Sequence, residues 1–136
     1  IEKPKIIYIL ADDLGYGELG VYGQEKIETP NIDALAKSGM LFTQHYSGAP
    51  VCAPSRYMLM TGKHAGHAQI RGNDEWAERG EVWNFEKAMS QPNLERQHPI
   101  FTSRVTVGEI LQDPGYKTAI VGKWGLSSPL TEGIPN

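Results

Sequence analysis

The only cysteine in the 136-residue chain, Cys52, is the side chain best suited to nucleophilic chemistry. Pro54 follows two positions later, and proline is favoured in the first turn of a helix, where its missing N–H costs nothing. The spacing predicts a helix over residues 55–60 that Gly62 ends, with Cys52 at or just before its N-terminus. Free N–H groups and the positive end of the helix dipole attract anions there, and Arg56 lies about one turn further on. These residues predict a nucleophile in a site for an anionic substrate, although a lone cysteine is also commonly a small buried hydrophobic residue.

The stretch that contains Cys52 has a longer pattern than these residues alone. It reads Cys-x-Pro-Ser-Arg, then four residues, then Thr61-Gly62. This pattern resembles the signature of the type I sulfatases, in which the cysteine is oxidised after synthesis to formylglycine, an aldehyde. The enzyme that makes this modification reads the Cys, Pro and Arg of the motif, which are Cys52, Pro54 and Arg56 here. The signature also occurs in some phosphate and phosphonate ester hydrolases of the alkaline phosphatase superfamily, so it defines the nucleophile better than the substrate.

Asp12 and Asp13 form a second candidate site at the end of an apolar run. Residues 5–11 are rich in β-branched side chains, which predicts a strand buried on both faces. Ligands of open α/β sheets collect beyond the carboxyl ends of the strands, and two adjacent carboxylates repel each other unless a cation or strong donors lie between them. A divalent metal with oxygen ligands satisfies this need, although Asp-Asp before Gly15 is also ordinary turn chemistry. The resemblance implies that Asp12 and Asp13 bind calcium together with the modified Cys52.

A third candidate site follows the strand predicted over residues 116–121, which ends in Gly-Lys-Trp-Gly. A solvated lysine is the ordinary outcome at such a position. The segment also resembles the second sulfatase signature, which implies that Lys123 contacts the sulfate and the formylglycine as a catalytic and substrate-binding residue. In many sulfatases the residue two positions later is a histidine that hydrogen-bonds the formylglycine hydroxyl. Gly125 stands here instead, so the group that manages the second proton transfer is not assigned.

The segment after Gly62 carries two histidines, His64 and His67. They are either metal ligands or acid–base groups, or loop residues that flank a glycine turn, and the spacing favours the loop. Arg71 is a candidate second cation for an anionic substrate, although a surface arginine is the commoner outcome. Residues 74–98 mix charged and aromatic side chains and read as an excursion between core elements, either a shaper of specificity or a lid.

Between the aspartate pair and the cysteine, the sequence predicts one helix and one strand. Thr29 is expected to cap the helix, Pro30 to open it and Gly39 to close it. Residues 40–46 then read as a strand that leads to the Cys52 turn. Strand, helix, strand, reactive turn and helix is the order of an α/β fold.

A further helix is predicted over residues 106–113, where Pro114-Gly115 stops it. Its apolar residues Val107, Ile110 and Leu111 are expected to face inward. The resemblance implies an alkaline-phosphatase-like sandwich, in which helices flank a central, mostly parallel sheet, present only in part in this chain.

Length and composition limit the classes of protein that the chain can represent. Its 136 residues are a typical length for a single domain. Its net charge of -3 gives no indication of nucleic-acid binding. A single cysteine excludes an internal disulfide, and no apolar run is long enough to span a bilayer. The catalytic domain of sulfatases is several times longer and supplies further metal ligands and a C-terminal subdomain. We therefore expect residues 1–136 to be the N-terminal portion of such a domain, poorly stable and inactive alone.

The resemblance implies a sulfuric ester hydrolase. Formylglycine is hydrated to a geminal diol, one hydroxyl attacks sulfur while the alcohol leaves, and loss of the second hydroxyl's proton expels sulfate and restores the aldehyde. Arg56 stabilises the nucleophile, and Lys123 neutralises the sulfate oxygens. The expected substrate is a small-molecule or carbohydrate sulfate ester. The expected partner is a formylglycine-generating or anaerobic maturation enzyme, and the expected location is periplasmic or extracellular in a bacterium. Two alternatives stay open: a phosphate or phosphonate ester hydrolase, and a non-catalytic fragment or inactive paralogue.

Overall fold

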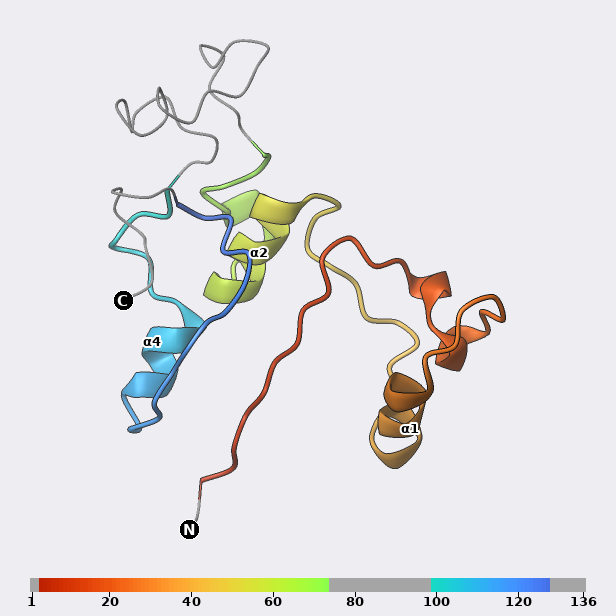
Figure 1. The fold of residues 1–136 in the computed structure, drawn as a ribbon. Helices are drawn as coiled ribbons and strands as arrows, with labels where there is room; N and C mark the ends of the chain where they lie inside the picture. The colour runs from red at the N-terminus through yellow and green to blue at the C-terminus, as the bar shows by residue number, and fades with distance from the viewer. Residues whose placement is uncertain (1–2, 74–98, 128–136) are drawn as a thin grey trace, which may run out of the picture. The chain divides into compact units, whose positions relative to one another are not determined.

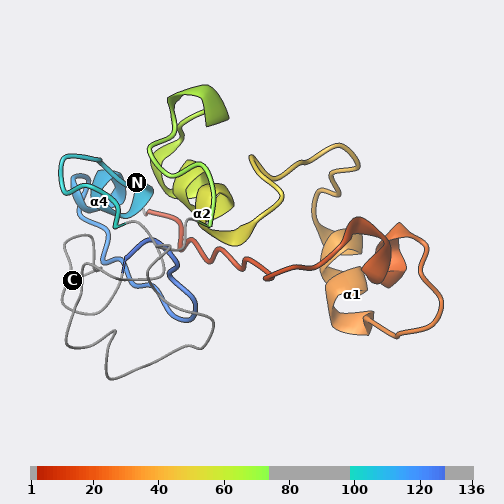
Figure 2. The same ribbon diagram turned by 90° about the horizontal axis from the view of Figure 1, so that it is seen from above.

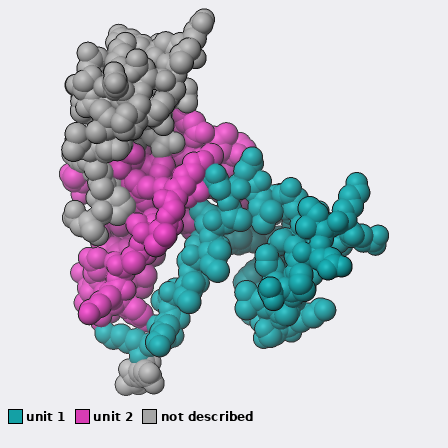
Figure 3. Space-filling view, in the orientation of Figure 1, with its two compact units in different colours: residues 1–46 teal, residues 47–136 magenta. Residues whose placement is uncertain are grey.

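The computed structural model describes residues 3–73 and 99–127 of the chain (Figure 1). The chain divides into two compact units, residues 1–46 and residues 47–136 (Figure 3). The predicted excursion over residues 74–98 and the last nine residues of the chain, 128–136, lie outside the described residues. In the described ranges, no helix has the length and apolar composition needed to cross a bilayer.

The first unit consists of an extended stretch and three short helices. Residues 3–11 run as an extended trace in both ribbon views (Figures 1 and 2). They are followed by the 3-10 helices η1 (Tyr16–Glu18) and η2 (Gly20–Tyr22) and by the α-helix α1 (Pro30–Ser38). The predicted helix is therefore confirmed, with Pro30 in its first turn and Gly39 directly after its end.

The prediction that the Thr29 side chain caps α1 is wrong. Its hydroxyl donates to Asp33 Oδ1 at 3.0 Å and accepts from the Gly20 N–H at 2.8 Å. Asp33 Oδ1 also accepts from the Val21 N–H at 2.8 Å, so the hydroxyl is held between η2 and α1 and not at the helix end. A Cβ at position 20 would lie 2.6 Å from Asp33 Oδ2, so any other residue there would force the Asp33 carboxylate to move. These contacts fix η2 against the start of α1.

The second unit contains α2 (Cys52–Thr61), the 3-10 helix η3 (Ala65–His67) and α4 (Val107–Gln112). Its hydrophobic core gathers one face of α2 and residues from three later segments. The core consists of Ala53, Tyr57, Met58, Ala68, Ile70, Ile100 and Leu126. The Ile100 N–H donates to the Leu126 carbonyl at 2.7 Å, which joins the two segments furthest along the chain.

The helix predicted over residues 106–113 is confirmed as α4, and its ends have recognisable caps. The Thr106 hydroxyl accepts from the Glu109 N–H at 3.4 Å, while the Glu109 carboxylate accepts from the Thr106 N–H at 2.7 Å, which is a capping box. At the other end, Gly115 lies in the left-handed region at φ 87° and its N–H donates to the Gln112 carbonyl. Two of the residues expected to face inward do not do so: Val107 is 42% exposed and Ile110 is 57% exposed.

The strands predicted over residues 5–11, 40–46 and 116–121 are not formed as paired strands in the described part of the chain. A strand is stable only when its backbone N–H and C=O groups pair with a neighbour. Ile7 and Ile9 are each 85% exposed and Val121 is 97% exposed, so these apolar runs are uncovered here. The central sheet of the predicted sandwich therefore stays a prediction.

Candidate functional site

Cys52 is the first residue of α2, as the sequence predicted. Val51 precedes the helix in extended conformation (φ -123°, ψ 161°), and Pro54 lies in the first turn. Gly62 ends the helix in the left-handed region at φ 64°, and its N–H donates to the Met58 carbonyl at 2.8 Å. The Cys52 side chain is half-buried, so it is held by the protein and still reachable.

The helix N-terminus offers fewer free N–H groups than the sequence predicted. The Ala53 N–H donates to Asn73 Oδ1 at 2.9 Å, and the Ser55 N–H donates to the Val51 carbonyl at 3.2 Å. Pro54 has no N–H to offer. An anion at Cys52 therefore meets mainly the helix dipole and charged side chains, and not a cradle of backbone amides.

Lys123 supplies a charge at this position, and the structure brings it to the cysteine from 71 residues away in the sequence. Its Nζ donates to Cys52 Sγ at 3.2 Å. One Arg56 guanidinium nitrogen donates to the Lys123 carbonyl at 2.5 Å, so the arginine holds the backbone of the lysine. Three of the predicted site residues thus meet in one place, with Lys123 exposed and the other two half-buried.

The core of the second unit determines where Lys123 lies. Leu126, three residues after the lysine, is 0% exposed, and Tyr57 of α2 is also 0% exposed. Trp124 packs against the same core. Because α2 and the segment after Lys123 share this core, their separation is set by side-chain packing, which tolerates little movement.

Arg71 is exposed and lies at the η3 turn, and its predicted role as a second cation for an anionic substrate stays a prediction. Its Nε donates to the Ala68 carbonyl at 3.0 Å, and one terminal nitrogen donates to the Gly66 carbonyl at 3.0 Å. These bonds close the η3 turn. His64 Nδ1 accepts from the Gly66 N–H at 3.1 Å, which confirms the histidine pair as part of a glycine turn.

Asn73 is the residue that sequence reasoning missed. It follows Arg71 by two positions, and its amide oxygen is the partner of the Ala53 N–H. Asparagine is one of the preferred acceptors for helix N-terminal N–H groups, but here it comes from 20 residues further along the chain. Only the absence of a capping side chain at Val51 indicated that a partner from elsewhere was needed.

Comparison with known proteins identifies the family. The sulfatase family model matches residues 4–129. The chain belongs to the sulfatase family. Human steryl-sulfatase is 41% identical over 124 residues, which make up 91% of this chain and 19% of the relative. Human arylsulfatase D is 39% identical over 122 residues, 90% of this chain and 18% of the relative. The N-acetylgalactosamine-6-O-sulfatase of Bacteroides thetaiotaomicron is 38% identical over 125 residues, 92% of this chain and 21% of the relative.

The match also shows how much of its relatives the chain covers and from which organisms those relatives come. The chain spans about a fifth of the length of the curated relatives it matches. Those relatives come from human and from a bacterium, so the predicted bacterial source stays a prediction.

Gly125 stands where many sulfatases carry a histidine, and its backbone explains the preference for glycine in this chain. Its φ is 75°, and Gly122 has φ 102°. Both angles lie in the left-handed region, which side chains disfavour by about 1–2 kcal/mol. Lys123 is therefore bracketed by two glycines that let the chain turn sharply on each side of it.

The predicted calcium ligands Asp12 and Asp13 lie in the first unit and are both exposed. Asp13 has φ 58°, the only positive φ at a non-glycine residue in the described ranges. Aspartate tolerates this conformation better than most residues. Over residues 3–73 and 99–127, no three His, Cys, Asp or Glu side chains cluster closely enough to hold a metal. Carboxylates are the hard oxygen ligands that calcium prefers, so the pair fits a calcium site to which further ligands are added.

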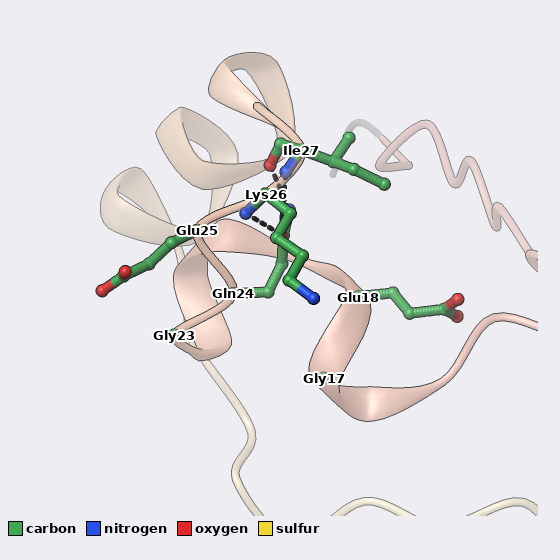
Figure 4. Close-up of a pocket in the computed structure, with 7 residues that line it drawn as sticks. All are labelled: Gly17, Glu18, Gly23, Gln24, Glu25, Lys26 and Ile27. Carbon is green, nitrogen blue, oxygen red and sulfur yellow. Dashed lines mark hydrogen bonds between the residues drawn. The ribbon is translucent and has the colours of Figure 1, made fainter.

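The first unit also contains an open pocket (Figure 4). It lies between η1 and the loop before α1 and is lined by residues such as Glu18, Glu25 and Lys26. The Gln24 side chain bonds the Lys26 and Ile27 backbone across it. These contacts lie within one loop, and no Cys, Ser, Thr or His side chain lines the pocket.

Proposed function

We propose that the chain is the N-terminal, nucleophile-bearing portion of a longer sulfatase that hydrolyses sulfate esters, with Cys52 converted to formylglycine. The observation that supports this most directly is the 3.2 Å contact between Lys123 Nζ and Cys52 Sγ. Two motifs 71 residues apart in the sequence meet there, with the cysteine in the first turn of α2. A half-buried nucleophile beside a fixed cation is suited to an anionic ester.

Each residue of this site has a task that follows from its position. When present, formylglycine supplies the hydroxyl that attacks sulfur. Lys123 Nζ, within hydrogen-bond distance of the Cys52 side chain, would donate to a sulfate oxygen as negative charge develops on the leaving group. Arg56 holds the lysine backbone through its carbonyl and adds a second positive charge beside the nucleophile. Pro54 fixes the first turn of α2, which orients the side chain at position 52.

Calcium is the metal that fits the aspartate pair. Asp12 and Asp13 supply carboxylate oxygens, and adjacent carboxylates of this kind are stabilised by a hard divalent cation. In the proposed enzyme both carboxylates bind calcium, which lowers the negative charge that an incoming sulfate ester meets. Calcium titration of the full protein tests this assignment, and Asp12→Asn is expected to weaken the measured affinity at least tenfold.

The substrate is proposed as a small-molecule or carbohydrate sulfate ester. Relatives at 38–41% identity carry names for a steryl-sulfatase and an N-acetylgalactosamine-6-O-sulfatase, and a sterol and a sugar have only the sulfate group in common. The roles proposed for Cys52, Arg56 and Lys123 all concern that shared group. The family match and these names favour a sulfate ester over a phosphate or phosphonate ester. By resemblance to exported sulfatases, we propose a periplasmic or extracellular location and a formylglycine-generating or anaerobic maturation enzyme as partner.

Hydrolysis of an aryl sulfate by the longer protein, co-produced with a maturation enzyme, tests the proposal. The wild type is expected to release the phenol with turnover, while Cys52→Ala is expected to show no activity above the uncatalysed rate. Ser47→Ala, which removes a hydroxyl that bonds the Ala49 carbonyl and contacts Ser55, is a control expected to retain activity. Equal rates of aryl sulfate hydrolysis by wild type and Cys52→Ala would refute the proposal. So would hydrolysis of the corresponding aryl phosphate without hydrolysis of the aryl sulfate.

A further inference from the structure

We propose that Asn73 is a positioning residue for the nucleophile, acting through the backbone of α2. This inference rests on the proposed function, because it names a residue that holds the proposed nucleophile in place. The contact that carries it is the 2.9 Å bond from the Ala53 N–H to Asn73 Oδ1. Ala53 directly follows Cys52 in the first turn, so this bond fixes the peptide that carries the nucleophile.

The local sequence gives α2 no other means of satisfying this N–H. Val51, the residue before the helix, has an apolar side chain and makes no capping bond. The serine at position 55 directs its hydroxyl to Ser47 Oγ at 2.6 Å, so it is engaged elsewhere. Unsatisfied N–H groups at a helix start let the first turn fray. The amide oxygen of Asn73 is therefore the acceptor that keeps the first turn closed.

Asn73 is itself held by the turn that precedes it. Arg71, two residues earlier, donates to the Gly66 and Ala68 carbonyls, which closes η3. Ala68 and Ile70 lie in the core at 4% and 1% exposure. Hydrogen bonds and core packing thus both hold the segment that precedes Asn73. The Asn73 side-chain amide therefore contacts α2 from a fixed backbone.

The consequence is a defined distance between the nucleophile and its cation. Lys123 Nζ is 3.2 Å from Cys52 Sγ because α2 and the lysine segment pack on one core. If the first turn frays, the side chain at position 52 moves while the lysine stays. Displacement of a reacting group by about 1 Å can lower the rate by about 100-fold. Asn73 does not touch the substrate in this account and acts only through the α2 backbone.

The first test uses the longer protein produced without a maturation enzyme, so that position 52 keeps its thiol. Rates of alkylation by anionic iodoacetate and neutral iodoacetamide are compared, because their ratio reports the cation beside the sulfur and not general access. We expect Asn73→Ala to lower this ratio about tenfold towards that of a free thiol. Asn73→Asp keeps an acceptor oxygen but adds a negative charge that repels iodoacetate, so the ratio is expected to rise above that of Asn73→Ala without reaching the wild-type value. Thr106→Ala removes the corresponding N-terminal cap from α4 and is the matched control, with an unchanged ratio.

The second test uses the matured protein and an aryl sulfate. We expect Asn73→Ala to lower kcat about 10- to 100-fold with KM within about twofold, because the nucleophile is displaced while the sulfate contacts remain. Asn73→Asp is expected to recover most of kcat. Equal alkylation ratios and equal kcat for wild type and Asn73→Ala would overturn the inference. Equal losses of kcat in Asn73→Ala and Asn73→Asp would also overturn it.

If Asn73→Ala does not fold, amide hydrogen exchange of Ala53 in the wild type decides: protection at the level of the α2 interior supports the bond, and exchange at the rate of an open amide overturns it. If the matured wild type hydrolyses no sulfate ester, the proposed function fails, while the alkylation ratio and the exchange rate still test the position of Asn73.

Discussion

Replacing Lys123 by alanine tests how much the positive charge beside the nucleophile contributes to activity. The variant removes the Nζ that lies 3.2 Å from Cys52 Sγ and leaves its carbonyl, the acceptor for Arg56, in place. The backbone of the site is therefore kept, and only the charge is lost. This separation makes the variant a test of electrostatic stabilisation and not of folding.

The size of the effect follows from the exposure of the lysine. Removing one donor that stabilises a developing negative charge lowers kcat by about 10²–10³. Because the Lys123 side chain is exposed, solvent screens part of its field, and we expect the lower end of this range, about 100-fold. A 100-fold loss corresponds to about 2.7 kcal/mol of transition-state stabilisation.

The assay is steady-state hydrolysis of an aryl sulfate by the matured longer protein, with kcat and KM measured separately. Lys117→Ala is the matched control, since it removes an exposed lysine six residues earlier and the same charge. We expect Lys117→Ala to stay within about twofold of the wild type, because long-range charges are screened. The reasoning is refuted if Lys123→Ala keeps half or more of the wild-type kcat/KM, or if both variants lose activity equally.

Three further predictions concern stability and are measured by denaturant unfolding of the longer protein. Arg56→Ala is expected to lower the free energy of unfolding by about 1.5 kcal/mol, since it removes a charged donor to the Lys123 carbonyl. Arg56→Lys lacks the planar guanidinium group and should recover only part of the lost stability. Full recovery in Arg56→Lys would contradict this prediction. Gly62→Ala should lower the free energy of unfolding by about 1–2 kcal/mol, because Gly62 has φ 64°. Gly17→Ala is the control and should lower it by less than about 1 kcal/mol, since Gly17 has φ -81° and open space around it. Equal losses would show that the left-handed conformation at the end of α2 is unimportant. Hydrogen bonds from Thr106, first from its backbone N–H and then from its hydroxyl, lower the pKa of Glu109 below its ordinary value of 4.5. The free energy of unfolding that wild type gains over Glu109→Gln should therefore be complete above pH 4.5 and disappear as the pH falls through the lowered pKa. A stability difference that grows in acid would contradict this prediction.

Local signals in the sequence predicted the helices of this chain well. Pro54 and Gly62 mark the start and the end of α2, and both act through backbone geometry that depends on one residue at a time. The capping box at Thr106 and the left-handed Gly115 define α4 in the same way. The side-chain role of Thr29 was mistaken because Asp33 and η2, nine residues upstream, compete for its hydroxyl.

Contacts between distant residues were predictable only in part. The two signature motifs indicated that Lys123 serves the same site as Cys52, and the structure brings them together across 71 residues. The Asn73 bond to Ala53 had no such signal, because an asparagine in a loop has many possible partners and the sequence does not select one. Strand pairing is also a property of distant segments, so the apolar runs predicted extended chain without fixing its neighbours.

The measurement that tests the central claim most directly is a peptide map of the longer protein across residues 51–56, after production with a maturation enzyme. The account predicts a Cys52 peptide that has lost H₂S and gained oxygen, and that reacts with an aldehyde-specific hydrazide in proportion to sulfate ester hydrolysis. An unmodified thiol at position 52 in a preparation that hydrolyses sulfate esters at full rate would contradict it.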